Sequence, residues 1–373
     1  MKKKNLYIIT GSRSEFGLLH PLIKNIKQNK NFKLNLIAHG SHFNKNFGNT
    51  FEEIEDSKIK ITDKIIINTN NYTQKGIVNF FSLSVNAFSK IFDKKKIDLI
   101  ILLGDRFETY AAAISAYFYN IPIAHIHGGE ITHGSLDDGI RHSITKLSNF
   151  HFVSNKTYKK RIIQLGENPK SIFSVGALGI ENINTIKFMS KLNIQKKLNI
   201  NISSTTLLVT FHPITTRNAE NKKYIENLLF ALDKIKNVKI IFTKSNTDSG
   251  NSIINNKIYK YVRNNSQKSY FFKSLGTINY LSLLKHIDCL VGNSSSGIFE
   301  APYLKIPTVN IGERQQGRVM SNSVINCNYE SRNIIKSINY AINNKKKLDY
   351  KKLYGSGKVS SKIVEILEKI NLK

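Results

Sequence analysis

One stretch in the first half of the chain is dense in side chains that can do chemistry. The 18 positions from His125 to His142 carry four histidines, three carboxylates and one arginine. Histidines and carboxylates at this density can act as general acids and bases. They can also bind a metal ion, but the spacing of His125, His127 and His133 does not match HExxH or a facial triad. We therefore expect proton transfer here, without a metal.

Residues within this stretch are expected to differ in their roles. His125 lies inside an apolar run, which predicts a buried histidine whose ring is already hydrogen-bonded. His127 follows at the tip of the same predicted strand, where it can reach a ligand. Asp137 and Asp138 precede an amphipathic helix, so we expect one of them to be its N-cap. Arg141 lies one turn further along that helix.

Two more motifs place a titratable side chain directly after a predicted strand. Asp105 follows the apolar run Leu99–Leu103, where a carboxylate is well placed for acid–base chemistry. An alternative is that Asp105 caps the next helix, and it can do both. His212 follows the run Leu207–Phe211, and the alternative there is an ordinary loop histidine.

Two loops are suited to phosphate groups. The loop Gly11–Gly17 joins a strand to a helix and contains Arg13, so helix amides and a guanidinium can meet a diphosphate. A polar turn, made of Ser294, Ser295, Ser296 and Gly297, also begins a helix. Glu300 lies one turn later, where its carboxylate can accept from both hydroxyls of a ribose, and Arg318 follows the next strand. The alternatives are an ordinary βα turn and serines that only cap a helix.

These motifs are positioned by short apolar runs that alternate with amphipathic segments. Such alternation, with continuous apolar strands, predicts parallel sheets covered on both faces. The predicted strands are Leu6–Thr10, Leu34–Ala38, Ile65–Ile67, Leu99–Leu103, Ile121–Ile126, His151–Val153, Leu207–Phe211, Val238–Phe242, Cys289–Val291 and Thr308–Ile311. The predicted helices are Leu18–Gln28, Ile77–Phe92, Arg106–Tyr117, Ile140–Leu147, Tyr224–Ile235, Ser252–Val262, Ile278–His286, Ile298–Leu304, Ile334–Ile342 and Lys358–Ile370.

The expected fold class is therefore α/β, with two doubly wound Rossmann-like domains facing a cleft. We place the first domain at residues 1–182, the second at 183–355 and the linker near Gly179–Asn184. A helix at 356–373 is expected to pack back on the first domain. Ligands of such sheets bind beyond the carboxyl ends of the strands, so the polar motifs should lie there.

The net charge of +30 indicates an anionic partner, but the basic excess is lysine spread along the whole chain. A nucleic-acid partner would call for a concentrated basic stripe with interleaved aromatics, which is absent from the sequence.

No apolar run approaches the roughly 18 residues of a membrane span. Two cysteines cannot build a disulfide framework, which fits a cytoplasmic protein. Of nine arginines, five fall in the motifs: Arg13, Arg106, Arg141, Arg314 and Arg318.

An ordered set of motifs resembles those of the hydrolysing UDP-N-acetylglucosamine 2-epimerases of bacterial sialic acid pathways. In order along the chain, these motifs are GSRSEFG, GDRFE, HIHGGE, DDGIRHSITKLS, FHP, NSSSGIFEAP and NIGERQQGR. The resemblance extends from about Ile8 to Arg318. It implies the glycosyltransferase-B fold, a UDP-sugar substrate, a homodimer, and no cofactor or metal. It also implies loss of the C2 proton and of UDP to give a glycal, followed by addition of water.

The resemblance also implies residue roles. Asp105 and Asp137 match catalytic carboxylates, and His212 matches a histidine near the diphosphate. The matching nucleotide-binding positions are Arg13, Ser294, Ser296, Glu300 and Arg318. Many relatives carry glutamate where this chain has His127, so either His127 or Glu130 can serve the hydration step. The resemblance favours UDP-N-acetylglucosamine as substrate, converted to N-acetylmannosamine and UDP. The alternative is the same reaction on UDP-2,4-diacetamido-2,4,6-trideoxyglucose, and a non-hydrolysing epimerase or a glycosyltransferase of the same fold is the remaining one.

Overall fold

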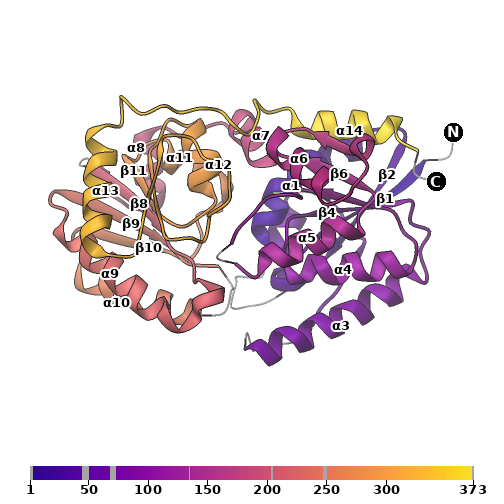
Figure 1. Cartoon of the computed structure of the whole chain (residues 1–373), viewed down its shortest axis with the longest axis horizontal. Helices are drawn as coiled ribbons and strands as arrows, with labels where there is room; N and C mark the ends of the chain where they lie inside the picture. The colour runs from indigo at the N-terminus through magenta and orange to yellow at the C-terminus, as the bar shows by residue number, and fades with distance from the viewer. Residues whose placement is uncertain are drawn as a thin grey trace. The chain divides into compact units, whose positions relative to one another are not determined.

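The computed structural model in Figure 1 describes residues 3–43, 50–67, 73–133, 135–202, 205–246 and 250–371. The chain forms two compact units. Unit 1 comprises Met1–Glu130, Asp137–Asn182 and Tyr354–Lys373, and unit 2 comprises Ile131–Leu136 and Ile183–Leu353. Each unit contains one parallel sheet with helices around it, as the alternation in the sequence predicts.

Unit 1 is built on a seven-stranded parallel sheet in the order β3-β2-β1-β4-β5-β6-β7. Its strands are β1 (Lys4–Thr10), β2 (Phe32–Ala38), β3 (Asp63–Lys64), β4 (Leu99–Leu103), β5 (Ile123–Ile126), β6 (Phe150–Val153) and β7 (Ile172–Ser174). Its helices are α1 (Arg13–Gln28), α2 (Phe51–Asp56), α3 (Gln74–Phe92), α4 (Phe107–Phe118), α5 (Asp137–Leu147), α6 (Lys156–Gln164), α7 (Leu178–Thr185, which runs into unit 2) and α14 (Val359–Lys369). The strand order reverses between β1 and β4, which makes this the switch point where such sheets bind ligands.

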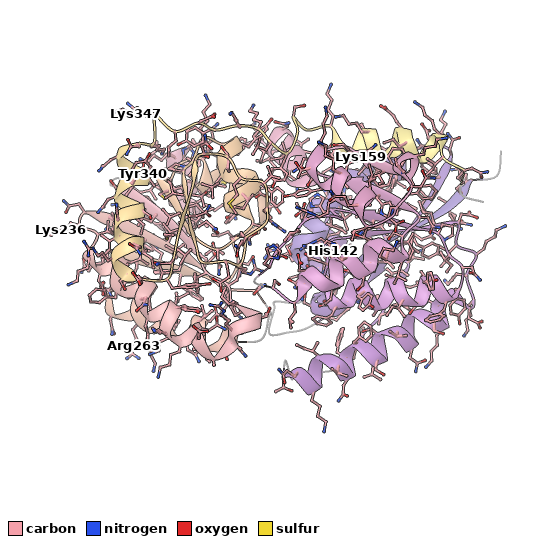
Figure 2. All side chains as sticks on the ribbon, viewed as in Figure 1. His142, Lys159, Lys236, Arg263, Tyr340 and Lys347 are labelled. Atoms are coloured by element: carbon pink, nitrogen blue, oxygen red, sulfur yellow. The ribbon has the colours of Figure 1, made fainter. Side chains whose placement is uncertain are left out.

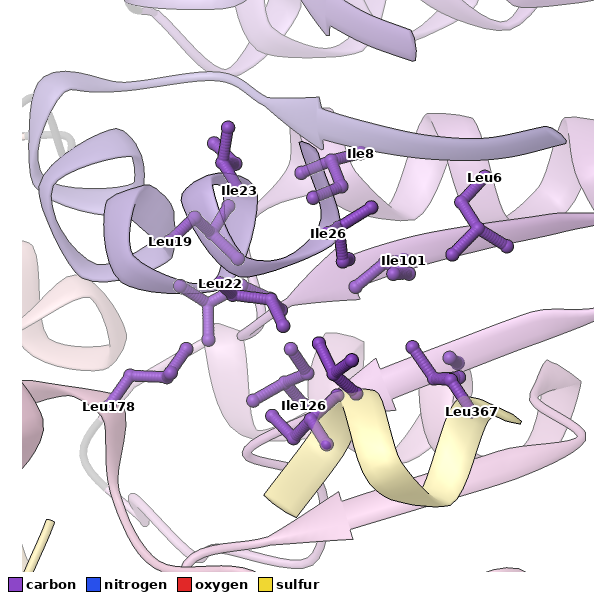
Figure 3. Close-up of a cluster of buried hydrophobic side chains, with 14 of the residues drawn as sticks. Leu6, Ile8, Leu19, Leu22, Ile23, Ile26, Ile101, Ile126, Leu178 and Leu367 are labelled. Atoms are coloured by element: carbon purple, nitrogen blue, oxygen red, sulfur yellow. The ribbon is translucent and has the colours of Figure 1, made fainter. Parts of the chain in front are cut away.

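The core of unit 1 explains why α1 and α14 lie on the sheet. Apolar residues of α1 recur at helical spacing and are fully buried: Leu19, Leu22, Ile23 and Ile26. Figure 3 shows them beside strand residues such as Ile101, with Leu367 of α14 in the same cluster. Burying one such side chain stabilises the fold by about 1.5–3 kcal/mol.

A buried carboxylate holds the start of α14 in unit 1. Glu181 of α7 accepts a hydrogen bond from the backbone N–H of Ser360 at 2.7 Å and another from the Ser360 hydroxyl. The first amides of a helix have no partner within the helix, so Glu181 satisfies one that would otherwise be lost.

Unit 2 is built on a six-stranded parallel sheet in the order β10-β9-β8-β11-β12-β13. Its strands are β8 (Thr205–Thr210), β9 (Val238–Thr243), β10 (Ser269–Phe272), β11 (Cys289–Gly292), β12 (Thr308–Ile311) and β13 (Val324–Cys327). Its helices are α8 (Lys191–Leu198), α9 (Asn221–Lys234), α10 (Asn251–Asn264), α11 (Gly276–Leu284), α12 (Ser296–Tyr303) and α13 (Ser331–Asn343). Here the order reverses between β8 and β11, which is the switch point of this sheet.

Unit 1 passes into unit 2 between Asn182 and Ile183, within the stretch expected to link the domains, and this crossover lies inside helix α7, where Ile180 and Ile183 are buried. One local prediction is wrong. The strand expected at Ile65–Ile67 is displaced, since β2 pairs with Asp63–Lys64 instead. The sequence also gave no prediction for α2, α6, α8, β7, β10 or β13, which are short or rich in polar residues.

Basic side chains lie on the surfaces of both units. Figure 2 labels Lys159 on α6, Lys236 after α9, Arg263 on α10 and Lys347 after α13. No helix in the described part of the chain is long and apolar enough to cross a membrane.

Candidate active site

Both switch points carry the polar motifs. In unit 1 the loop from Gly11 follows β1, Asp105 follows β4, and His127 follows β5, the neighbour of β4. In unit 2, His212 follows β8 and the serine turn follows β11. This layout follows from parallel pairing, because the carboxyl ends of adjacent strands meet at one edge of a sheet.

A buried arginine organises the acidic residues of unit 1. The guanidinium of Arg141 pairs with the carboxylate of Asp105 and donates to Asp138 Oδ1 at 3.3 Å. It also donates to the backbone carbonyl of Glu130 at 2.9 Å. The Arg141 side chain is 1% exposed, whereas those of Asp105 and Asp138 are each 22% exposed. A buried cation therefore holds two carboxylates that are partly exposed to solvent.

The charge of Arg141 is maintained by its surroundings. Burial lowers the pKa of its guanidinium, but Asp105, Glu130 and Asp137 together raise it above its usual range. A charged arginine without these acceptors would be costly at this depth.

The capping alternatives for the aspartates are not supported. Arg106, not Asp105, occupies the N-cap position of α4, and the Arg106 side chain makes no cap hydrogen bond. Asp137 and Asp138 are the first two residues of α5, inside its first turn, where the helix dipole favours negative charge. Asp138, which the sequence suggested only as a possible N-cap, accepts a hydrogen bond from Arg141.

His125 is buried scaffold, as expected from its place inside an apolar run. Its Nε2 donates to the Gly104 carbonyl at 2.7 Å, and its Nδ1 lies 3.2 Å from Thr145 Oγ1. Burial lowers the pKa of the ring to about 3, so His125 stays neutral. It fixes the turn that precedes Asp105.

His127 and Glu130 are tied to the protein around them. His127 has a left-handed backbone conformation (φ 67°), and its Nε2 accepts from the Leu178 amide at 3.4 Å. Its Nδ1 lies 3.7 Å from the carboxylate of Glu130, which is buried and accepts from Ser154 Oγ at 2.9 Å. Both side chains are less exposed than Asp105 or Asp138, so they are less well placed to meet a substrate. In the described part of the chain, no group of three or more His, Cys, Asp and Glu residues could hold a metal ion.

The first loop ends in a capped helix. Ser12 is the N-cap of α1 and accepts from the Glu15 amide, and Arg13 is the first helical residue, partly buried. The amide of Gly11 donates to Glu15 Oε2 at 2.7 Å. The Gly11 amide is therefore already hydrogen-bonded within the protein. In this motif, the group best suited to bind a phosphate is the guanidinium of Arg13.

Two hydrogen bonds with Asn293 hold the backbone of His212 against the serine turn in unit 2. The His212 amide donates to Asn293 Oδ1 at 2.7 Å, and Asn293 Nδ2 donates to the His212 carbonyl at 2.9 Å. The ring Nδ1 accepts from the Asn246 amide at 3.1 Å. Burial and nearby Arg314 lower the pKa of His212 well below its usual value. His212 is therefore neutral, with its proton on Nε2, and acts as a hydrogen-bond donor.

The serine turn caps helix α12 through Ser294, and not through the N-cap residue Ser295. Ser295 occupies the N-cap position of α12 without a side-chain cap bond, and Ser294 Oγ accepts from the Ser296 amide at 3.4 Å. Gly297 has a packing role, since a Cβ there would come within 2.5 Å of Thr308 Cγ2. The close approach of α12 to β12 therefore requires this glycine.

Glu300 carries a hydrogen-bonding atom without a partner. Its Oε2 is buried and has no hydrogen-bond partner among the described residues. Burial raises the pKa of this carboxyl to about 7, and Ser296 and Arg318 act in the opposite direction. Tyr280, which the sequence did not single out, donates from its hydroxyl to Ser296 Oγ at 2.8 Å. The guanidinium of Arg318 lies over the ring of Phe299, 5.1 Å from its centre.

The loop after β12 is joined to the same network. Gln315 Nε2 and Arg314 Nη1 donate to the Asn293 carbonyl at 2.8 and 3.3 Å. Neither Asn293 nor Gln315 was a candidate from sequence. No spacing rule could have identified them, because their role is to join loops that are distant along the chain.

A segment between two candidate carboxylates belongs to unit 2. The chain leaves unit 1 after Glu130 and returns at Asp137, and Ile131–Leu136 lies with unit 2. The His133 amide donates to the Gln316 carbonyl at 3.3 Å, and the Leu136 amide donates to Thr215 Oγ1 at 3.1 Å. Within unit 2 this segment therefore lies against the loop that carries Arg314 and Arg318.

Comparison with known proteins identifies the family. The model of the family described as UDP-N-acetylglucosamine 2-epimerase matches residues 24–368. The chain belongs to this family. The resemblance inferred from the ordered motifs is thus confirmed for the UDP-N-acetylglucosamine 2-epimerase family as a whole.

Two relatives and one solved structure show which proteins of the 2-epimerase family this chain is similar to. A Campylobacter jejuni protein named GDP/UDP-N,N'-diacetylbacillosamine 2-epimerase (hydrolyzing) is 41% identical over 87% of this chain and 84% of its own length. A Legionella pneumophila protein named UDP-N,N'-diacetylbacillosamine 2-epimerase (hydrolyzing) is 32% identical over 100% and 97%. The structure of UDP-GlcNAc 2-epimerase from Neisseria meningitidis bound to UDP-GlcNAc superposes with a TM-score of 0.83, covering 98% of this chain and 100% of that one at 18% identity. That likeness confirms the fold.

Proposed function

We propose that the protein is a hydrolysing 2-epimerase of a UDP-linked 2-acetamido sugar, and that UDP-N,N'-diacetylbacillosamine is its substrate. The names of the Campylobacter and Legionella relatives support this sugar. UDP-N-acetylglucosamine, which the sequence motifs favoured, is the second candidate. It is supported by a Neisseria meningitidis relative of that name, 32% identical over 91% of this chain and 87% of its own length.

The observation that carries the proposal is the buried Arg141 holding two partly exposed carboxylates, those of Asp105 and Asp138. A weakly acidic C–H needs a base in a fixed position, and Asp105 is held in this way. In the proposed reaction Asp105 takes the C2 proton while the C1–O bond to UDP breaks, giving a glycal. Water then adds to C1 and a proton returns to C2 from the opposite face. We assign this second proton transfer to the acidic start of α5, with Asp137 and Asp138.

The departing diphosphate requires hydrogen-bond donors. Neutral His212 carries its proton on Nε2, and Arg13 and Arg318 offer guanidinium groups. Donors aimed at developing negative charge stabilise a transition state more than they stabilise the bound substrate. We therefore propose that His212 acts on the leaving group.

Replacing His212 by phenylalanine is expected to lower kcat by about 10²–10³-fold, the usual effect of removing one such donor. The Kd for UDP should rise by less than tenfold, because the remaining donors stay in place. Steady-state kinetics and calorimetric titration with UDP measure the two quantities. A kcat within threefold of the parent would show that His212 does not act on the leaving group.

The reaction itself is tested by following products in D2O. Purified protein is mixed separately with UDP-N,N'-diacetylbacillosamine, its GDP analogue and UDP-N-acetylglucosamine, and free nucleotide and free sugar are quantified by NMR. We expect equal amounts of UDP and a free 2-epimeric sugar with deuterium at C2, and the highest kcat/KM for the diacetamido substrate.

Other products would contradict the proposal in distinct ways. A 2-epimeric nucleotide sugar as sole product would indicate a non-hydrolysing epimerase. UDP release without deuterium at C2 would indicate simple hydrolysis or transfer. A higher kcat/KM for UDP-N-acetylglucosamine would make that sugar the substrate.

A further inference from the structure

A cluster of charged side chains is buried beneath the first loop of unit 1, apart from the residues assigned to the reaction above. Two carboxylates belong to it, Glu15 of α1 and Glu108 of α4, and both are buried. Arg106 pairs with Glu108 through two hydrogen bonds of 3.0 and 3.1 Å. Buried charges are retained only where partners compensate them, so each contact in this cluster matters.

Glu15 connects the loop that carries Arg13 to helix α4, whose preceding turn carries Asp105. Its Oε2 accepts from the Gly11 amide at 2.7 Å and from Ser12 Oγ at 3.3 Å. Its Oε1 accepts from Thr109 Oγ1 of α4 at 3.2 Å. The one side chain therefore joins the loop after β1 to the helix after β4, across the switch point of the sheet.

The loop is held from its other side by the end of β2. The Gly11 carbonyl accepts from the Ser41 amide at 2.8 Å and from Ser41 Oγ at 2.9 Å. Gly40 fits between them, since a Cβ there would lie 2.7 Å from the Gly11 carbonyl oxygen and 3.3 Å from Glu108 Cγ. With both its amide and its carbonyl engaged, Gly11 has little freedom to move.

We propose that Glu15 is a positioning residue for the epimerase reaction: it holds the loop that presents Arg13 in register with the turn that presents Asp105. Arg13 lies two residues before Glu15, and Asp105 immediately precedes Arg106. The inference rests on the proposed function, because it assigns these two residues to the substrate. A displacement of about 1 Å at reacting groups can cost on the order of 10²-fold in rate.

The hydrogen-bond pattern favours ionised Glu15, because all three of its named partners are donors. Burial and the neighbouring Glu108 act against ionisation, whereas Arg106 favours it, and the pKa of Glu15 rises to about 7. His39, from the end of β2, also faces this cluster but stays neutral, because burial lowers its pKa to about 3. Below about pH 7 a proton on Glu15 should therefore loosen the loop.

The test replaces Glu15 by glutamine, which keeps the shape but puts an N–H₂ group against donors. We expect kcat/KM to fall at least tenfold. We also expect the acid limb of the wild-type pH profile near pH 7 to disappear. The Kd for UDP, set mainly by unit 2, should change less than threefold.

Thr109→Val is a milder second variant that removes one hydrogen bond to Glu15, and we expect its kcat/KM to fall three- to tenfold. Glu365→Gln on the exposed face of α14 is the matched control.

A Glu15→Gln enzyme with kcat/KM within threefold of the parent and an unchanged acid limb would overturn the inference. If that variant does not fold, Thr109→Val with wild-type kcat/KM overturns it. An inactive wild type would instead overturn the proposed function. In that case the cluster is tested by thermal unfolding. Because the pKa of Glu15 is higher in the folded state than in the unfolded state, the stability of the wild-type protein should fall as the pH rises from about 4.5 to 7. Glu15→Gln should flatten this dependence, and an unchanged slope would overturn the inference in that case.

Discussion

Replacing Asp105 by asparagine should abolish UDP release, lowering kcat by at least about 10³-fold, within the range that general bases contribute. Asparagine has nearly the same shape and can still accept a hydrogen bond from Arg141, but it cannot take a proton from carbon. The Kd for UDP should stay within a few-fold, because the residues proposed to bind the nucleotide are mostly in unit 2. Coupled detection of UDP and calorimetric titration measure the two effects.

The control for this experiment is Asp93→Asn, at the exposed end of α3, which should leave kcat unchanged. Near-normal turnover in Asp105→Asn would reject the assignment of Asp105 as the base. Loss of UDP binding together with turnover would mean instead that Asp105 holds the substrate or the fold.

Replacing Arg141 by leucine should both inactivate the protein and destabilise it by about 3–5 kcal/mol, the usual cost of removing one partner of a buried ion pair. The carboxylate of Asp105 and the carbonyl of Glu130 would lose their buried donor. Arg141→Lys keeps the charge but not the planar fork, so we expect a smaller loss of stability and a kcat still reduced by at least tenfold. Urea unfolding monitored by circular dichroism gives the stability change.

Arg263→Leu is the matched control, since Arg263 is exposed on α10 and should change stability by less than about 0.5 kcal/mol. An Arg141→Leu protein as stable as the parent would show that the buried charge network does not support the fold. A stable but inactive variant would restrict Arg141 to a role in the site.

The placement of Asp105 could be predicted because it depends on local sequence alone. Five consecutive apolar residues define β4, and all five are buried, so the next polar residue must lie at the edge of the sheet. His125 could be assigned as scaffold for the same reason, since it lies inside a buried strand. The serine turn after β11 was likewise found from its position between a strand and a helix.

Pairings between distant segments could not be predicted. The partner of Asp105 is Arg141, 36 residues away, and the pairing depends on the register of β4 with β5 and on the rotation of α5. The same rotation brings Asp138 within hydrogen-bonding distance of that arginine. The role of Glu15 was overlooked because its distant partner, Thr109 of α4, reaches it only when β1 and β4 become neighbours.

The path of the chain has a consequence for dissecting this molecule. Unit 1 is assembled from three separate lengths of chain, the last of which carries α14. A fragment ending at Asn182 would leave α1 without the helix that packs against it, and Glu181 without the amide it binds. A premature stop codon near the end of the gene would therefore damage the unit encoded at its beginning. Independent expression of unit 1 would require a rearranged gene in which α14 is joined directly to α7.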